Sequence, residues 1–308
     1  MRIALLGGTG FIGSRVAREL VSAGHTVLVV HRGRRPAPAR CASSVTDRAD
    51  GSGLARALAE FETQTLLDMI AYTERDVEQV LPALPAGLRR IVVISSGDVY
   101  QTYGAFLGLE PPDSVAESTG EEAPLRSSRY PYRATARSRD DMLFDYDKVL
   151  VESRYREAPT PVTTLRLPMV YGPGDPNARV ATERRRLRSA VGGVLELNPG
   201  EAAWRCTRGY VDDVARAVAL ATTQRAASGR TYNVGETDAL ATADWLAEIA
   251  RATGEPIAIR TSPEVAPSRR GEWTVSLVAD TGRIRRELSF VEPVGRRAGL
   301  LRTLAHSG

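Results

Sequence analysis

The chain has 308 residues, of which 43% are hydrophobic and 25% are charged, values typical of a globular protein with a sizeable core. It contains no apolar run of about 18 residues and no secretory leader pattern, so we expect a cytoplasmic protein without a membrane span. Two cysteines and three histidines are too few and too scattered for a disulfide framework or a metal site. The net charge of +4 is not gathered with aromatic residues, and we therefore do not expect a nucleic-acid partner.

Apolar runs alternate with helical patterns through the first 170 residues. Strands are predicted over 2–6, 26–30, 65–71, 90–96 and 162–172, and helices over 14–24, 53–61, 74–84 and 148–157. Alternating strands and helices form a parallel sheet that is covered on both faces. The sequence therefore predicts an α/β fold of the Rossmann type, a doubly wound parallel sheet with a smaller C-terminal substrate domain.

The pattern loosens after residue 172. We predict a nucleotide-binding domain over 1–172 and a smaller substrate-binding domain over 173–308, with the chain returning to the first domain near 205–235. Short strands are expected at 202–211 and 230–235, and helices at 183–188, 213–223 and 242–253. Residues 101–143 are polar, are interrupted by proline and glycine, and carry Tyr103, Phe106, Tyr130 and Tyr132. A loop of this length between regular elements indicates a lid over the site.

The segment "GGTGFIG" lies between the first predicted strand and the first predicted helix. In that place glycines let the backbone approach a pyrophosphate, and the N–H groups of the helix N-terminus stabilise its charge. The segment therefore predicts a dinucleotide site, and its contact residues are Gly7, Thr9, Gly10, Phe11, Ile12 and Gly13.

The second strand ends in "HRGRR", with His31 where an acidic residue would bind the ribose 2′-hydroxyl of NAD. Arg32, Arg34 and Arg35 follow, and guanidinium groups pair with a 2′-phosphate through charge-assisted hydrogen bonds. We therefore predict NADP(H) as the cofactor. Asp47 is placed to accept a hydrogen bond from the adenine amino group, with Asp50 as its near neighbour.

Several motifs in order along the chain resemble the extended short-chain dehydrogenase/reductase family, also called the NAD-dependent epimerase/dehydratase family. They are "GGTGFIG", "VVISSGDVY", "LRLPMVYGPGDP", "RGYVDDVARAVALA", "TYNVGE" and "DTGRIRRELSF". The "HRGRRP" segment is more similar to atypical members. The resemblance implies an enzyme whose Ser96 holds the substrate oxygen, with further cofactor contacts at the strand ends from Ala71, Tyr72, Ser95, Leu167 and Met169.

Lys148 is the only lysine among 41 basic residues, and Glu152 follows it at the family's spacing. An ammonium offers three donors on a compact centre, which a planar guanidinium does not replace. The resemblance implies that Lys148 binds the nicotinamide ribose and lowers the pKa of a catalytic tyrosine.

That tyrosine is missing from its usual place, because residue 144, four before the lysine, is phenylalanine. Tyr146 is two residues before Lys148, and on a helix the two side chains would point about 200° apart. Tyr146 therefore reaches the site only if the helix begins later than in the family. The other candidates are a lid tyrosine (Tyr130 or Tyr132), Asp98 or another carboxylate, or no proton-transfer group at all.

Two further departures concern the substrate. Met169 stands where sugar-nucleotide relatives often have asparagine, and Cys206 stands where they often have a diphosphate-binding arginine. Arg208 follows two residues later on the same strand face. These changes argue against a nucleotide sugar, and we predict substrate contacts from Tyr130, Tyr132 and Arg208.

The favoured function is an NADP(H)-dependent oxidoreductase or epimerase that acts on a carbonyl or hydroxyl group of a small metabolite. The alternatives are a non-redox lyase, cyclase or isomerase on the same scaffold, and an NADP-sensing or RNA-associated binding protein. Family members often dimerise through the helices at 74–84 and 148–157, so by analogy we expect a homodimer.

Overall fold

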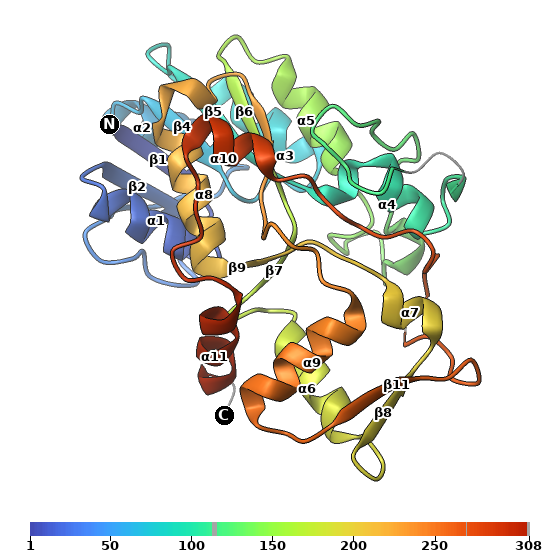
Figure 1. Ribbon diagram of the computed structural model, residues 1–308. Helices are drawn as coiled ribbons and strands as arrows, with labels where there is room; N and C mark the ends of the chain where they lie inside the picture. The colour runs from blue at the N-terminus through green and yellow to red at the C-terminus, as the bar shows by residue number, and fades with distance from the viewer. Residues whose placement is uncertain (113–115, 269, 307–308) are drawn as a thin grey trace.

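The computed structural model describes residues 1–112, 116–268 and 270–306, and it is built on a parallel sheet (Figure 1). Seven strands lie in the order β10-β6-β5-β4-β1-β2-β3, and every neighbouring pair is parallel. The strands are β1 (Arg2–Leu6), β2 (Thr26–His31), β3 (Ala42–Val45), β4 (Thr65–Asp68), β5 (Arg90–Ser96), β6 (Val162–Leu167) and β10 (Thr231–Asn233). The predicted Rossmann-type fold is confirmed.

Alternate residues of each central strand enter different cores because a strand points successive side chains to opposite faces. Ile3 and Leu5 of β1 pack with helices on one face, and Ala4 and Leu6 pack on the other. The first face is covered by α1 (Gly13–Ser22) and α8 (Val211–Thr223), and the second by α2 (Gly51–Glu60), α3 (Glu74–Val80) and α5 (Lys148–Arg156). Residues 211–233 thus add a helix and a strand to the large sheet, although they follow residue 172.

The remaining elements lie mostly beyond the carboxyl edge of the sheet (Figure 1). Two small parallel pairs join β7 (Met169–Tyr171) to β9 (Arg208–Tyr210) and β8 (Val194–Leu197) to β11 (Ala258–Thr261). The helices are α4 (Gln101–Phe106), α6 (Arg179–Arg188), α7 (Pro199–Ala203), α9 (Thr242–Thr253), α10 (Gly282–Leu288) and α11 (Arg296–His306).

Several predicted bounds were wrong for local reasons. The strand expected over 202–211 begins only at Arg208, because Asn198 caps α7 and its side chain accepts the N–H of Gly200. The strand expected over 65–71 ends at Asp68, whose carboxylate turns the chain by accepting the N–H of Ile70. The edge strand β3 was not predicted, since "ASSV" is short and polar.

The segment 101–143 begins with α4 and is tied to the rest of the molecule at several places. Isolated bridges join Tyr100 to Leu125 and Thr119 to Ala279. Phe106 packs against Trp204, with ring centroids 5.1 Å apart. Residues 113–115 of the predicted lid lie outside the described residues. The segment thus contributes packed residues to the wall of the site, among them Tyr103 and Tyr132.

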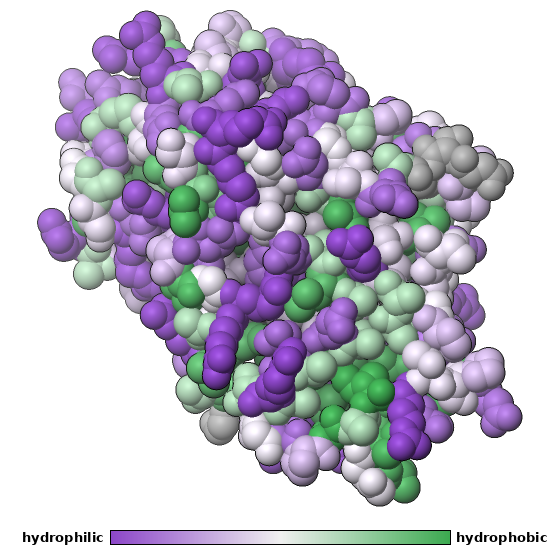
Figure 2. Space-filling model, in the orientation of Figure 1, coloured by the Kyte–Doolittle hydropathy of each residue, from purple (hydrophilic) through white to green (hydrophobic). Residues whose placement is uncertain are grey.

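Hydrophilic side chains cover much of the face shown in Figure 2, and apolar ones gather over the small β8–β11 pair. No helix in the described part of the chain is long and apolar enough to cross a membrane.

Candidate functional site

The carboxyl ends of β1, β2, β4 and β5 meet at one edge of the sheet, because the strands are parallel. At the end of β1 the chain turns at Gly7, whose φ is +86°, and a Cβ there would lie 2.5 Å from Ile70 Cγ2. A Cβ on Gly13 would lie 2.3 Å from the Gly7 carbonyl oxygen. Only glycine fits both positions, so the turn that also holds Thr9, Gly10, Phe11 and Ile12 forms a bare backbone cradle before α1.

At the end of β2, His31 occupies the acidic residue's place and is fixed by local hydrogen bonds. Its Nε2 lies 2.8 Å from Ser43 Oγ on β3, and its Nδ1 accepts the N–H of Gly33 at 3.1 Å. Arg32, Arg34 and Arg35 are exposed, and none forms an ion pair within the described ranges. This corner of the sheet is therefore cationic.

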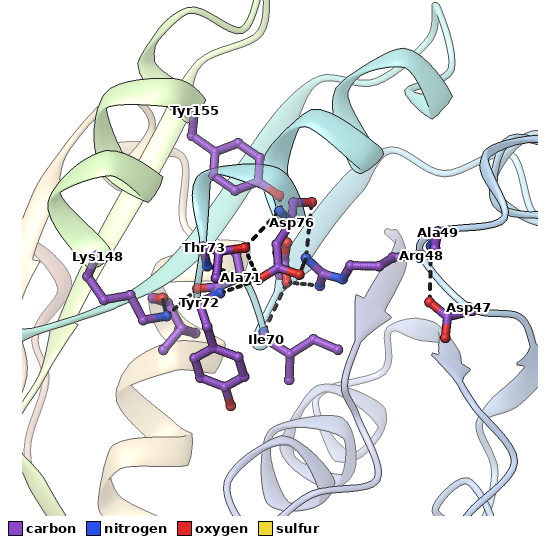
Figure 3. Close-up of polar contacts among 12 residues, drawn as sticks. Asp47, Arg48, Ala49, Ile70, Ala71, Tyr72, Thr73, Asp76, Lys148 and Tyr155 are labelled. Carbon is purple, nitrogen blue, oxygen red and sulfur yellow. Dashed lines mark hydrogen bonds and ion pairs between the residues drawn. The ribbon is translucent and has the colours of Figure 1, made fainter. Parts of the chain in front are cut away.

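After β3, the side chain of Asp47 points outward and that of the next residue, Arg48, points inward (Figure 3). Asp47 is exposed and accepts the N–H of Ala49. The Arg48 side chain is 9% exposed and pairs with Asp68 at 2.8 Å, while Tyr155 donates to the other Asp68 oxygen at 2.6 Å. Burial acts to raise the pKa of Asp68, but the Arg48 guanidinium outweighs it and the pKa is lowered. This ion pair fixes the position of Arg48, the residue that follows Asp47.

Lys148 is the first residue of α5, and its side chain is only 3% exposed. Figure 3 shows it reaching toward Ala71 beside the Tyr72 ring. Its ammonium donates to the carbonyls of Ala71 at 2.5 Å and Ile94 at 2.8 Å, at the ends of β4 and β5. Burial lowers the pKa of Lys148 to about 8. The Ser95 hydroxyl, in contrast, donates a hydrogen bond to the buried Glu152 carboxylate at 2.5 Å.

The start of α5 is set by Asp147. Its carboxylate caps the helix by accepting the N–H of Val149, and it also accepts the N–H of Tyr130 at 2.8 Å. Arg126 donates to it at 2.7 Å, and both side chains of this pair are fully buried. Because α5 begins only at Lys148, Tyr146 precedes the helix and the helical-face argument does not apply to it.

Tyr146 reaches the end of β5. Its hydroxyl donates to Asp98 Oδ2 at 2.8 Å, and Tyr146 and Ser96 both line the cavity described below. Tyr132, from the predicted lid, donates to the same Asp98 oxygen at 3.1 Å and contacts the Tyr103 hydroxyl at 3.0 Å. The structure therefore brings together Ser96, Asp98, Tyr132 and Tyr146, four residues that the sequence analysis named separately.

Two other aromatic residues of this region lie elsewhere. The Arg133 guanidinium lies 3.7 Å from the Tyr130 ring centroid and 4.6 Å from that of Phe144. Neither ring lines the cavity described next. The substrate contact expected of Tyr130 stays a prediction; in the structure its ring stacks with Arg133 and does not line the cavity.

A cavity of about 650 Å³ opens in front of Ser96 and Tyr146. All three tryptophans of the chain line it, and so do the predicted residues Leu167, Met169 and Arg208. Arg208 stacks on Trp245 at 4.6 Å and donates to the carbonyl of Cys206 at 3.1 Å. Cys206 itself is 3% exposed and packs in a cluster with Phe106, Trp204 and Val275.

The charges around the cavity are largely neutralised by the protein. Three of its four arginines hold a carboxylate within 2.8 Å, in the pairs Arg166–Glu152, Arg179–Asp175 and Arg186–Glu201. The walls are therefore aromatic surfaces with fixed polar groups rather than a field of one sign.

Sequence reasoning missed the Arg126–Asp147 pair, Trp204, Trp245, Trp273 and Glu201. The aspartate before the helix was a visible capping signal, but its buried partner lies 21 residues away. The three tryptophans come from segments far apart in the chain, and no spacing rule joins them.

The sequence model of the NAD dependent epimerase/dehydratase family matches residues 3–235. The 2′-dehydrokanamycin reductase of Streptomyces kanamyceticus is 25% identical over 287 residues, covering 91% of this chain and 72% of that protein. The UDP-glucose 4-epimerase of Thermotoga maritima, solved with UDP-glucose, superposes with a TM-score of 0.70 at 22% identity, covering 100% and 98% of the two chains. The Bordetella bronchiseptica enzyme WbmG, solved with NAD and UDP, gives 0.72 at 18% identity, covering 99% and 93%. The chain thus belongs to the NAD dependent epimerase/dehydratase family of enzymes.

Proposed function

We propose that the protein is an NADP(H)-dependent oxidoreductase that interconverts a ketone and a secondary alcohol on a ring-shaped polar metabolite without a nucleotide. The observation that carries this proposal is the Tyr146 hydroxyl, which donates to Asp98 at 2.8 Å and lines the cavity together with Ser96, although residue 144 is phenylalanine. Lys148, at the start of α5, donates to the carbonyls of Ala71 and Ile94, so a hydroxyl, a phenol and an ammonium stand at the carboxyl edge of the sheet.

Each of these residues has a separate task. The glycine cradle fits a pyrophosphate, and the bound nicotinamide supplies a hydride donor or acceptor. Two N–H groups of the Lys148 ammonium go to Ala71 and Ile94, which leaves the third for a ribose hydroxyl. Ser96 holds the substrate oxygen, and Tyr146 gives that oxygen a proton during reduction or takes it during oxidation.

The choice of NADP(H) rests on the corner at the end of β2. A carboxylate there would repel a 2′-phosphate, whereas this chain has His31 and three exposed arginines. Two solved relatives were crystallised with NAD, and the basic corner is the feature of the present chain that supports NADP(H) instead.

The substrate class rests on the cavity walls. Tryptophan faces are suited to the apolar faces of saturated rings, and the fixed polar groups between them orient hydroxyl or amino substituents. Cys206 sits in an apolar cluster where a diphosphate would need a cation. The name of the Streptomyces relative gives a dehydro derivative of kanamycin as its substrate, which supports a ketone without a nucleotide.

Cofactor and substrate are tested together. Dissociation constants for NADPH and NADH are measured first, and then the nicotinamide absorbance is followed with 2′-dehydrokanamycin, a panel of cyclic keto sugars, and UDP-glucose. Tighter binding of NADPH and its oxidation by a keto sugar without a nucleotide support the proposal. Turnover of UDP-glucose alone contradicts the substrate class. Bound NADPH that no ketone oxidises contradicts the redox function and favours a non-redox reaction.

A further inference from the structure

Asp98 is a buried carboxyl group at the cavity wall whose bonding is unequal between its two oxygens. It lies in the short helical turn Gly97–Val99 after β5 and is 4% exposed. Oδ2 accepts from both Tyr146 and Tyr132, whereas Oδ1 has no hydrogen-bond partner among the described residues. Burying an ionised carboxylate with one oxygen unsatisfied is unfavourable, and a neutral carboxyl group removes much of that cost.

Within the described ranges, no cation contacts this carboxyl group directly. Arg126 donates to the backbone carbonyl of Asp98, and the rest of its guanidinium is used by Asp147 and the Ser128 carbonyl. The Lys148 ammonium is held by two other carbonyls. Burial raises the pKa of Asp98, and the bonds from Tyr146 and Tyr132 and the more distant charges of Arg126 and Lys148 oppose this only in part.

The hydrogen-bond geometry sets a condition on Tyr146. While Asp98 is ionised, the Tyr146 proton points at Oδ2, and burial together with that carboxylate raises the pKa of Tyr146. A phenol in this state is a weak proton donor to any other oxygen. When Asp98 carries a proton on Oδ2, it donates to the Tyr146 oxygen, and the phenol proton is free to point into the cavity.

We propose that Asp98 stores the proton of the reaction and passes it through Tyr146, an inference that rests on the proposed redox function. During reduction the carbonyl carbon receives a hydride from the reduced nicotinamide, and the carbonyl oxygen receives the Tyr146 proton. The Asp98 proton moves to the Tyr146 oxygen in the same step. The products are the alcohol, the oxidised nicotinamide, a neutral phenol and an Asp98 carboxylate, and oxidation runs the same transfers in reverse.

The chain of hydroxyls continues from Asp98 toward the cavity. Tyr132 bonds both Asp98 and Tyr103, and Tyr132 and Tyr103 are half-buried and line the cavity. They provide a route by which Asp98 regains its proton between turnovers. Tyr132 is thus a positioning residue that also sets the proton affinity of Asp98, because its hydrogen bond stabilises the carboxylate.

The test is the pH dependence of kcat/KM for NADPH-dependent reduction of 2′-dehydrokanamycin, or of the panel ketone that the wild type reduces fastest. Reduction needs protonated Asp98, so kcat/KM is level at low pH and falls tenfold per pH unit above the pKa of Asp98. Tyr132→Phe moves this fall in kcat/KM, the descending limb of the pH profile, to higher pH. The reason is that the Asp98 carboxylate loses the hydrogen bond donated by Tyr132. Tyr100→Phe is the matched control: its hydroxyl bonds Asn233 at 2.7 Å, so the limb stays in place.

Asp98→Asn keeps the hydrogen bonds to the tyrosines but has no proton to give. We expect kcat/KM of this variant to fall by about 10²- to 10⁴-fold and the descending limb of its pH profile to disappear. An unchanged Kd for NADPH and an unchanged Tm would show that the site is still folded. A limb that Tyr132→Phe leaves in place, or a limb at the wild-type position that survives in Asp98→Asn, overturns the proposal; a separate fall near pH 8 belongs to Lys148.

A second readout does not depend on turnover. The infrared carboxylic-acid band that is absent in Asp98→Asn is titrated in the wild type and in Tyr132→Phe. A band that persists above the usual pH range of aspartic acid supports proton storage at Asp98. In Tyr132→Phe the band should persist to a still higher pH than in the wild type. A carboxylate that ionises in the usual range overturns it. If no ketone is reduced, the proposed function fails while this titration still decides the state of Asp98.

Discussion

The buried pair between Arg126 and Asp147 should be among the costliest places to mutate, because it fixes where α5 begins. Asp147→Asn keeps an oxygen to cap Val149 but leaves the Arg126 guanidinium buried without a charged partner. Breaking one side of a buried pair costs about 3–5 kcal/mol, a large part of a typical stability of about 5–15 kcal/mol. Asp145→Asn is the matched control, since its ion pair with Arg133 is largely exposed and should contribute less than about 1 kcal/mol.

Urea unfolding of the two variants measures the difference directly, and NADPH oxidation reports whether Tyr146 stays in place. We expect the free energy of unfolding to fall by several kcal/mol in Asp147→Asn and to change little in Asp145→Asn. If Asp147→Asn is too unstable to purify, the double variant Arg126→Met/Asp147→Asn should recover part of the loss, because it removes the unpaired charge. Equal stability of the two single variants would refute the role given to this pair.

Three further outcomes are expected. Replacing Arg32 and Arg34 together by serine should raise the Kd for NADPH about 10- to 100-fold and leave the Kd for NADH unchanged, as measured by titration calorimetry; parallel changes for both cofactors would contradict a 2′-phosphate site. The pKa of Lys148 is lowered from 10.5 to about 8 by burial, so between these values the folded state releases its proton first and the free energy of unfolding rises with pH by up to about 3 kcal/mol. Urea unfolding at pH 7 and pH 10 should show this rise in the wild type and not in Lys148→Met, and an equal rise in both would count against it. Trp273→Ala should raise the KM for a keto sugar roughly two- to tenfold with little change in kcat, and an unchanged KM would remove Trp273 from the substrate wall.

The sequence predicted the sheet well because β1, β2 and β5 contain apolar runs and because Gly7 and Gly13 of the first turn have a steric reason. Gly7 and Gly13 both lie where a Cβ would collide with neighbouring atoms. Patterns of this kind are local, so neighbouring residues suffice to read them. The edge strand β3 lacks an apolar pattern, and only its pairing with β2 makes it a strand.

The candidate site was harder to predict because it depends on contacts between distant segments. The spacing argument assumed a helix that runs through residue 144, as the family comparison suggests. Asp147 instead makes the helix begin late, at Lys148, and its buried partner Arg126 is not indicated by any local sequence pattern. The aromatic cavity is likewise assembled from the end of α7, α9 and the segment after residue 270.

The central claim is that Tyr146 is the proton-transferring phenol in place of residue 144. The most direct measurement is single-turnover oxidation of bound NADPH by 2′-dehydrokanamycin, or by the fastest ketone of the panel, in Tyr146→Phe and in Phe144→Tyr/Tyr146→Phe. We predict that Tyr146→Phe binds NADPH with unchanged Kd and loses about 10²- to 10⁴-fold in rate, and that a tyrosine at 144 does not restore it. A Tyr146→Phe variant that keeps the wild-type rate, or a full rescue from position 144, would contradict the account.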